Sequence, residues 1–393
     1  MNSWSSSGTL TTLERPVAPN NGLISGRKHA LDGLRTVAVA MVFLFHTVTE
    51  LTPGGSIGVD VFFTLSGFVI TLLIMKEYQA TGRLRLGVFY AKRLARLWPA
   101  LLAVCAVVVT VALVFPQSGW GGQGANAIPA AAYVMNLANF GAFGSSTGGN
   151  ALSPTWTLAV EEQFYLVWPL LLLVMLRFWK VRTVAWLTAV LAAGFLVSRS
   201  LLVFGGAPLA RLYNGPDTRA DQLLLGCTLA LVFASVTPGS RVQASLQSAA
   251  RWAGPLAGLA LVAAVFALKE PATPGAWFAV FWSAGPTVLA LLSGVVIGSL
   301  VLRPAGFASR ILSHPWLANP GRDLSYAAYL WHLPVYLLLI PLVPSLWLRV
   351  PLAAALTVLM AWLSFRFVER PLRRWASRKL EPDVGTVTAR RPS

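Results

Sequence analysis

Two residues in the first apolar stretch of the chain have the types and spacing needed for proton-transfer chemistry. Arg35 and His46 lie in residues 29–46, HALDGLRTVAVAMVFLFH. In an α-helix, eleven steps end about 20° past three full turns and ~16 Å further along the axis, so the two side chains share one face. An ionisable group at membrane depth usually faces a protein interior or a water-filled cavity. His46 is therefore a candidate general base, and a structural histidine bonded to a neighbouring helix is the alternative.

Three carboxylates could assist this histidine. Asp60 lies in GVDVFFTLSGF, and Glu161 and Glu162 lie in WTLAVEEQFYLVWP. A carboxylate that holds one ring nitrogen of a histidine leaves the other nitrogen free to act as a base. We therefore expect Asp60 or Glu161 to orient His46, with helix capping as the alternative for Asp60. The adjacent glutamates point about 100° apart on a helix, so at most one should face a given cavity squarely.

A basic cluster lies at the start of the third apolar stretch. The segment FYAKRLARLWP contains Lys92, Arg93 and Arg96. Arg93 and Arg96 are one helical turn apart, and such a pair can bind phosphate through planar, charge-assisted hydrogen bonds. Positive charge that merely sets the membrane topology is the alternative.

The elements that must position these residues are membrane helices. The 393 residues are 56% hydrophobic and 11% charged, with a mean hydropathy of +0.65. We expect an all-α bundle of about ten spanning helices, because ten segments are long and apolar enough to span a bilayer, for which ~20 residues are needed. These segments lie near 31–50, 57–75, 97–115, 156–176, 183–204, 221–236, 253–268, 277–302, 324–343 and 346–368. A further segment, Ile128 to Phe140, is too short to cross and should lie in the interface or re-enter.

Charge sets the expected topology. The net charge of +17 comes from 31 basic and 14 acidic residues, and the basic ones lie mostly in alternate short connections. Cytoplasmic loops have this bias, so we expect both termini in the cytoplasm and a multi-pass protein of the cytoplasmic (inner) membrane. The fifth connection departs from the pattern with Arg211 and Arg219. Charge of this origin does not indicate a nucleic-acid partner.

Two further features of the apolar spans bear on chemistry. Cys105 and Cys227 both lie within spans, where neither a metal site nor a disulfide framework is expected. His332, in LSYAAYLWHLPVY, is a second intramembrane imidazole, followed closely by Pro334. For His332 we favour a structural or acceptor-site role over catalysis.

Six motifs in this order resemble the membrane acyltransferase-3 family, over about residues 28–374. They are Arg35 followed after ten residues by His46, then GVDVFFTLSGFVI, the RxxR of FYAKRLARLWP, WTLAVEEQFYLVWP, LSYAAYLWHLPVY and FVERPLRR. The family comprises integral-membrane O-acyltransferases that modify bacterial polysaccharides, lipid-linked sugars and some polyketide antibiotics. The chain departs from the family pattern at Thr157, where serine is commoner, and at Pro154, where many relatives carry histidine.

The resemblance implies an acyl-CoA donor, acetyl-CoA by default, that enters from the cytoplasm, and no metal. It makes His46 the essential catalytic histidine and Glu161 the carboxylate, whereas Asp60 is a catalytic candidate from its position in the sequence. The donor-binding candidates are Arg35, Lys92, Arg93 and Arg96, and the acceptor-binding candidates are Trp156, Glu162, Tyr329 and His332. Direct transfer and an acyl-histidine intermediate both remain open, as does the oligomeric state.

Three regions and several acceptors follow from this interpretation. We expect a disordered cytoplasmic arm over 1–27, a transmembrane acyltransferase domain over 28–375 and a disordered basic tail over 376–393. The expected acceptor is a hydroxyl of a surface polysaccharide, lipid-linked sugar or glycolipid. A macrolide or other polyketide is the alternative within the enzyme class, and a glycan or drug transporter is the alternative from another class.

Overall fold

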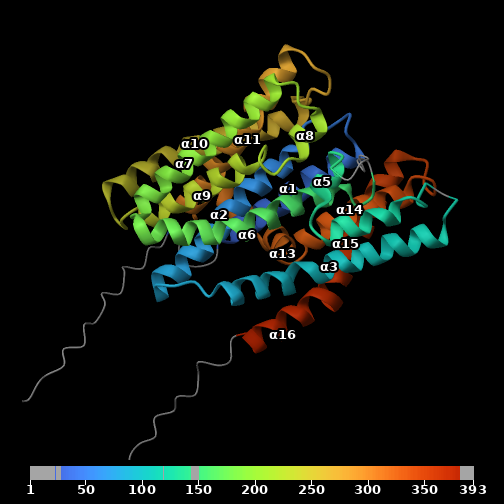
Figure 1. Ribbon diagram of the computed structural model, residues 1–393, viewed down its shortest axis with the longest axis horizontal. Helices are drawn as coiled ribbons and strands as arrows, with labels where there is room; N and C mark the ends of the chain where they lie inside the picture. Colours follow the sequence, from blue (N-terminus) through green and yellow to red (C-terminus); the bar gives the residue numbers. More distant parts are fainter. Residues whose placement is uncertain (1–22, 24–27, 118, 143–149, 381–393) are drawn as a thin grey trace, which may run out of the picture.

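A computed structural model describes residues 23, 28–117, 119–142 and 150–380 (Figure 1). The elements in these residues are helical. They are α1 (His29–Thr47), α2 (Ile57–Thr81), α3 (Leu86–Val114), α4 (Ala127–Ala131), α5 (Met135–Asn139), α6 (Trp156–Phe178), α7 (Val181–Phe204), α8 (Leu209–Asn214), α9 (Ala220–Ser235), α10 (Arg241–Ala267), α11 (Ala276–Leu302), α12 (Phe307–Leu312), α13 (Pro315–Asp323), α14 (Ser325–Leu339), α15 (Leu346–Ser364) and α16 (Arg370–Leu380). A π-helical turn, Phe365–Glu369, joins α15 to α16.

Every predicted span forms a helix, but not all of these helices are long. In the described part of the chain, eight helices are long and apolar enough to cross a bilayer. The predicted segments near 221–236 and 324–343 form α9 and α14, which have only 16 and 15 residues. The all-α, multi-pass architecture is thus confirmed, whereas the count of about ten spans is not.

The helices α2 and α9 pack closely against each other. A Cβ atom added at Gly67 would lie 1.9 Å from the carbonyl oxygen of Leu223, and one at Gly226 would lie 2.0 Å from that of Thr64. Small residues of this kind let the backbones of membrane helices approach each other. Figure 1 shows α1, α2, α7 and α9 together in the larger part of the molecule. The helices α3, α14 and α15 lie on the other side of the molecule.

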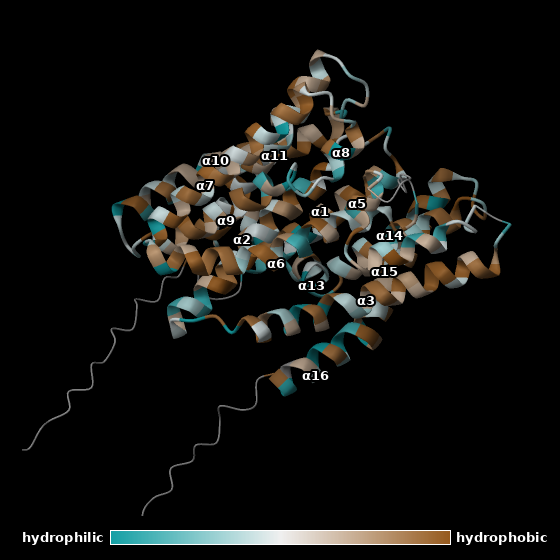
Figure 2. Cartoon of the chain, in the orientation of Figure 1, coloured by the Kyte–Doolittle hydropathy of each residue, from teal (hydrophilic) through white to brown (hydrophobic). Residues whose placement is uncertain are grey.

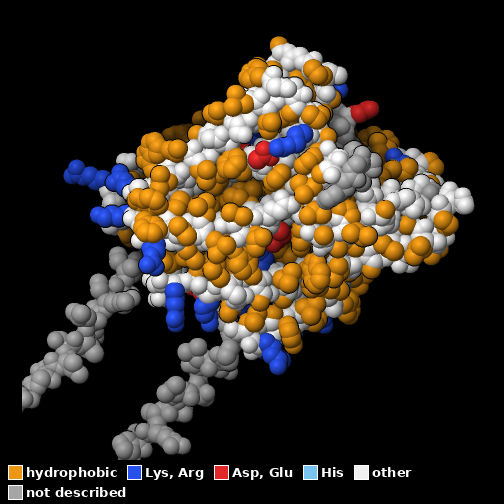
Figure 3. Space-filling view, in the orientation of Figure 1, with side chains coloured by type: hydrophobic (Ala, Val, Ile, Leu, Met, Phe, Trp, Pro, Cys, Tyr) orange, Lys and Arg blue, Asp and Glu red, His pale blue; other side chains and the backbone are white. Residues whose placement is uncertain are grey.

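The outer surface of the bundle is apolar. Large hydrophobic side chains such as Phe204 and Trp186 are 76% and 70% exposed, and Figure 2 shows hydrophobic residues along the outside of most helices. In Figure 3 lysine and arginine side chains gather along the left and lower edges of the view, and α16 lies at the lower edge in Figure 1. This separation of apolar and basic surface is typical of a protein embedded in a bilayer.

The long third connection folds back against the bundle. Ala130 and Met135, in α4 and α5, are fully buried. The indole Nε1–H of Trp98, near the middle of α3, donates to the carbonyl of Ala131 over 3.0 Å. The segment thus packs against the bundle, and both expectations for it, an interfacial and a re-entrant position, stay predictions.

The ends of the chain are described only in part. Most of the predicted arm over 1–27 lies outside the described residues, as does 381–393. The predicted tail nevertheless begins as helix, because α16 continues to Leu380.

Candidate active site

A cavity of about 140 Å³ lies where α1, α2, α3, α6 and α14 meet. Its wall carries both signs of charge as well as hydroxyl groups. The polar side chains that border it are those of Arg35, Ser66, Arg93, Arg96, Tyr133, Thr157, Glu161, Glu162, Tyr165, Ser325, Tyr326 and Tyr329. Four of the predicted donor-site and catalytic residues, Arg35, Arg93, Arg96 and Glu161, thus share one cavity.

Arg35 and Arg96 supply positive charge to this wall. Arg35 Nη1 lies 3.3 Å from Asp32 Oδ1, one turn earlier on α1. Arg96 is exposed, and among the described residues no carboxylate lies within ion-pair distance of it. The charged groups that interact electrostatically with Arg96 are Arg373, Arg35, Arg93 and Glu369. Arg96 is therefore the cation of the wall best placed to bind an added anion.

The other arginine of the RxxR motif is already paired. Arg93 donates from Nε and Nη2 to Glu162 over 2.8–3.0 Å, and its guanidinium lies 3.4 Å from the centre of the Tyr165 ring. Such bidentate pairs are geometrically specific. The phosphate-binding role expected for Arg93 thus competes with a bond to Glu162. Lys92 precedes it on α3 and does not border the cavity.

Both glutamates of α6 border the cavity, but they face different neighbours. Glu161 accepts a hydrogen bond from Ser66 Oγ on α2 over 2.9 Å, whereas Glu162 faces Arg93 on α3. The two side chains do diverge, as adjacent helical residues must. The cavity reaches both because it extends around α6 from α2 to α3.

His46 contacts a second imidazole rather than a carboxylate. His46 Nδ1 lies 2.9 Å from the carbonyl oxygen of Val42 and 3.3 Å from His332 Nε2, and the two rings are 5.0 Å apart. His332 is 1% exposed and His46 is half-buried. The expected contact of a carboxylate with His46 is absent from the described residues, because Glu161 is bonded to Ser66 and Asp60 faces Arg219.

Tyr329 lies between the cavity and the two histidines. Its side chain borders the cavity, and its ring centre is 5.4 Å from that of His332. Its hydroxyl lies 2.8 Å from Thr157 Oγ1 and donates to the carbonyl of Pro154 over 2.9 Å. Thr157 and Pro154 are the two positions that depart from the family pattern, so both departures contact the same tyrosine.

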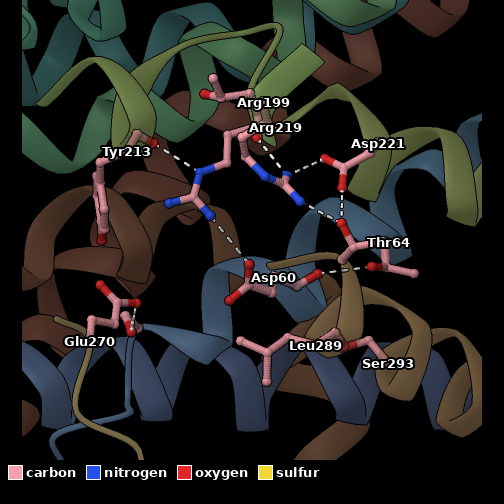
Figure 4. Close-up of polar contacts among 12 residues, drawn as sticks. Asp60, Thr64, Arg199, Tyr213, Arg219, Asp221, Glu270, Leu289 and Ser293 are labelled. Carbon is pink, nitrogen blue, oxygen red and sulfur yellow. Dashed lines mark hydrogen bonds and ion pairs between the residues drawn. The ribbon is translucent and has the colours of Figure 1, made fainter. Parts of the chain in front are cut away.

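Asp60 and Trp156 belong to a separate polar cluster (Figure 4). Asp60 Oδ1 lies 3.5 Å from Arg219 Nη1, and Arg219 Nε donates to the carbonyl of Tyr213 over 2.9 Å. The rings of Tyr213, Trp156 and Trp282 lie 4.9–5.7 Å from the Arg219 guanidinium carbon. Neither Asp60 nor Trp156 borders the cavity. Asp60 therefore joins α2 to the start of α9.

An acidic group in the connection between α10 and α11 lies beside this cluster. Glu270 accepts a hydrogen bond from Ser56 Oγ over 2.6 Å, and Figure 4 shows its side chain below Tyr213. Burial raises the pKa of the Glu270 carboxyl above its ordinary value, and the bond from Ser56 opposes that shift.

Several residues of the two sites were not identified from the sequence. Tyr133 borders the cavity from the third connection with a φ of 54°, rare for a residue other than glycine, and its carbonyl accepts from Gln163 Nε2 over 3.0 Å. Nothing in the local sequence marks it. Arg219 did carry a signal, since it departs from the positive-inside pattern: it is an internal ion-pair partner, not a loop charge.

The arrangement combines a cavity wall of mixed charge with a neighbouring pair of imidazoles. Among the described residues no three His, Cys, Asp or Glu side chains are grouped so as to hold a metal ion. The fold and the site define a multi-pass helical membrane protein with a cavity bordered by arginine, glutamate and hydroxyl side chains.

Sequence comparison identifies the family. The acyltransferase domain family matches residues 28–366, and the chain belongs to it. It is thus an enzyme of the acyltransferase class. It is 34% identical over 355 residues to the peptidoglycan O-acetyltransferase of Listeria monocytogenes, an alignment that covers 88% of this chain and 56% of that protein.

Two further relatives have similar names and align with the chain to a similar extent. The chain is 32% identical over 356 residues to a candidate peptidoglycan O-acetyltransferase of Bacillus subtilis, covering 87% of this chain and 54% of the relative. It is 30% identical to a candidate O-acetyltransferase of Staphylococcus aureus, covering 88% and 57%. The chain spans about half the length of these relatives. No solved structure matches the chain significantly.

Proposed function

We propose that this protein transfers an acyl group, acetyl by default, from acyl-CoA to a hydroxyl group of a cell-envelope glycan in the cytoplasmic membrane. The observation that carries the proposal is the cavity bordered by Arg35, Arg96 and Tyr329, because the Tyr329 ring contacts His332 and His332 contacts His46. The names of the relatives favour a glycan acceptor of the peptidoglycan kind over a macrolide. Family membership argues against the transporter alternative.

Arg35 and Arg96 are the proposed partners of the CoA phosphates. Charge-assisted hydrogen bonds to phosphate are among the stronger interactions that a partly enclosed site can offer. Arg35 and His46 are ~16 Å apart along α1, so a donor whose phosphates lie at Arg35 must extend a long arm toward the histidines. The pantetheine arm of CoA has this shape.

His46 is the proposed general base. Its Nε2 removes the proton from the acceptor hydroxyl as the hydroxyl oxygen attacks the thioester carbon. The C–S bond breaks, and the departing sulfur takes the proton from the imidazolium. Tyr329 borders the cavity next to the two imidazoles, so the thioester approaches His46 past the Tyr329 ring.

Replacing His46 tests this proposal directly. We expect His46→Gln to lower kcat for acetyl transfer by about 10²- to 10⁴-fold, because a positioned base contributes about that much. The measurement is mass spectrometry of peptidoglycan oligosaccharides incubated with acetyl-CoA and purified enzyme in detergent. The matched control is His314→Gln, since His314 is an exposed histidine at the start of α13. Full activity of His46→Gln would refute the assignment of the base.

A further inference from the structure

The buried His332 and the half-buried His46 form a directed hydrogen-bonded pair whose protonation can be assigned from their partners. His332 Nδ1 lies 2.5 Å from the carbonyl oxygen of Tyr329. A carbonyl oxygen only accepts, so Nδ1 of His332 carries the proton and its Nε2 carries the lone pair. The same reasoning applies to His46, whose Nδ1 lies 2.9 Å from the carbonyl of Val42 and therefore carries its proton there.

These assignments agree with the contact between the rings. The Nδ1–H of His46 is directed at both the Val42 carbonyl and the lone pair of His332 Nε2, which is 3.3 Å away. The reverse arrangement would place a lone pair of His46 against the Val42 carbonyl oxygen. Only the first arrangement satisfies all three contacts with two neutral rings, and it leaves the lone pair of His46 on Nε2.

From this geometry we propose that His332 is the positioning residue of the catalytic base: it accepts from His46 Nδ1–H, fixes the tautomer in which Nε2 is the base, and stabilises the imidazolium that forms. This inference rests on the proposed role of His46. A second-partner bond that orients the ring and fixes its tautomer is a general requirement for a histidine base. Here a neutral imidazole occupies the place expected for a carboxylate.

The surroundings of His46 offer few other titratable partners. On α14 these are Tyr329 and Tyr336, and Tyr336 donates its hydroxyl to the carbonyl of Thr47 over 3.1 Å. On α2 the acidic group is Asp60, which faces Arg219. The charged residues of α12 and α13, Arg310, Arg322 and Asp323, lie on elements that pack against the opposite end of α1, at Gly33 and Asp32. The described part of α11 carries no charged residue.

The test compares two substitutions of His332 with a matched control. His332→Leu removes the acceptor, whereas the amide oxygen of His332→Gln can take the place of Nε2. Tyr336→Phe is the control, because it removes a buried hydrogen bond between the same two helices, α1 and α14, without touching His46. Each protein is purified in detergent and assayed for kcat, for KM of acetyl-CoA and for the pH dependence of kcat.

We expect His332→Leu to lower kcat at least 100-fold with little change in KM, and His332→Gln to recover at least a tenth of wild-type kcat. Loss of the acceptor destabilises the His46 imidazolium, so the acidic limb of the kcat profile should move to lower pH in His332→Leu. It should not move in Tyr336→Phe. In ¹⁵N spectra of histidine-labelled wild-type protein, both Nδ1 atoms should be protonated at neutral pH.

Three results would overturn the proposal or its foundation. A His332→Leu variant with the kcat and pH profile of Tyr336→Phe would make His332 merely structural, and the role of His46 would stand. Equal and complete loss of activity in His332→Gln and His332→Leu would make His332 itself a proton-transfer group. Wild-type activity of His46→Gln would instead refute the proposed function on which this inference depends.

Discussion

At the scale of single residues, the two arginines of one motif have different environments. Arg93 is held by Glu162 and lies against Tyr165, whereas Arg96 has no carboxylate partner in the described wall of the cavity. An arginine without a counter-ion gains more from an added phosphate than one that must first exchange a carboxylate. The sequence does not distinguish the two arginines. The packing of α6 against α3 makes them different, because it places Glu162 beside Arg93.

Replacing Arg96 should weaken donor binding selectively. We expect Arg96→Gln to raise the KM for acetyl-CoA about 10- to 100-fold, because hydrogen bonds to charged groups contribute about 1.5–3 kcal/mol. With acetylpantetheine, which carries the thioester but no nucleotide phosphates, the variant and the wild type should be equally active. Arg310→Gln, on α12 and outside the cavity, is the control. An equal loss with both donors would contradict a phosphate-binding role.

At the scale of elements, the contact of α2 with α9 holds the site together. α2 carries Ser66, which bonds Glu161, and Asp60, which faces Arg219 at the start of α9. A second ion pair, Arg199 with Asp221, ties α7 to α9 and is completely buried. Burial makes breaking such a pair costly, although it says less about the net stability that the pair provides.

Widening this contact should destabilise the bundle. A Cβ at Gly226 would lie 2.0 Å from the carbonyl oxygen of Thr64 and 2.8 Å from the backbone nitrogen of Phe68, and neither atom can rotate away. We expect Gly226→Ala to lower the free energy of unfolding by at least about 1–3 kcal/mol, the usual cost of overpacking. The melting temperature in detergent measures this.

The control is a glycine in the same kind of element but without neighbours. Gly194, in the middle of α7, has nothing within 4 Å of an added Cβ. Gly194→Ala should leave stability unchanged or raise it by up to about 1 kcal/mol, because alanine favours helix. Equal destabilisation by both substitutions would mean that the α2–α9 contact is not what limits stability.

At the scale of the whole molecule, the charge distribution predicts which ends of the helices face the cytoplasm. Several connections are rich in lysine and arginine, whereas the third connection, residues 116–155, contains neither. The fifth connection is the exception, and its two arginines are engaged in ion pairs, Arg211 with Asp217 and Arg219 with Asp60. Because both arginines are engaged in these ion pairs, the fifth connection does not contradict the predicted topology.

Labelling of single cysteines checks this topology. Both native cysteines are buried, whereas Gly122 and Lys180 are exposed at connections that we expect on opposite sides of the membrane. A membrane-impermeant maleimide should label Gly122→Cys in intact cells and label Lys180→Cys only after permeabilisation. Labelling of both positions in intact cells would contradict the assigned orientation.

The sequence determined the helical membrane class and some of the residues that border the cavity. Membrane spans can be predicted from the sequence because a bilayer requires long apolar segments, whose backbone hydrogen bonds form within each helix. The motif around Arg35 and the RxxR of Arg93 and Arg96 did lead to the cavity wall. The short lengths of α9 and α14 could not be predicted in this way, because hydropathy does not show where packing against neighbouring helices allows a helix to end early.

Only the tertiary structure decided which polar groups pair. From the sequence we expect Asp60 or Glu161 as the partner of His46 and a structural or acceptor-site role for His332, although each of the three is a polar group in an apolar span. Whether two such groups meet depends on the depth and rotation of two different helices, and periodicity along one helix contains neither quantity. The packing of α14 against α1 places His332, and not a carboxylate, beside His46.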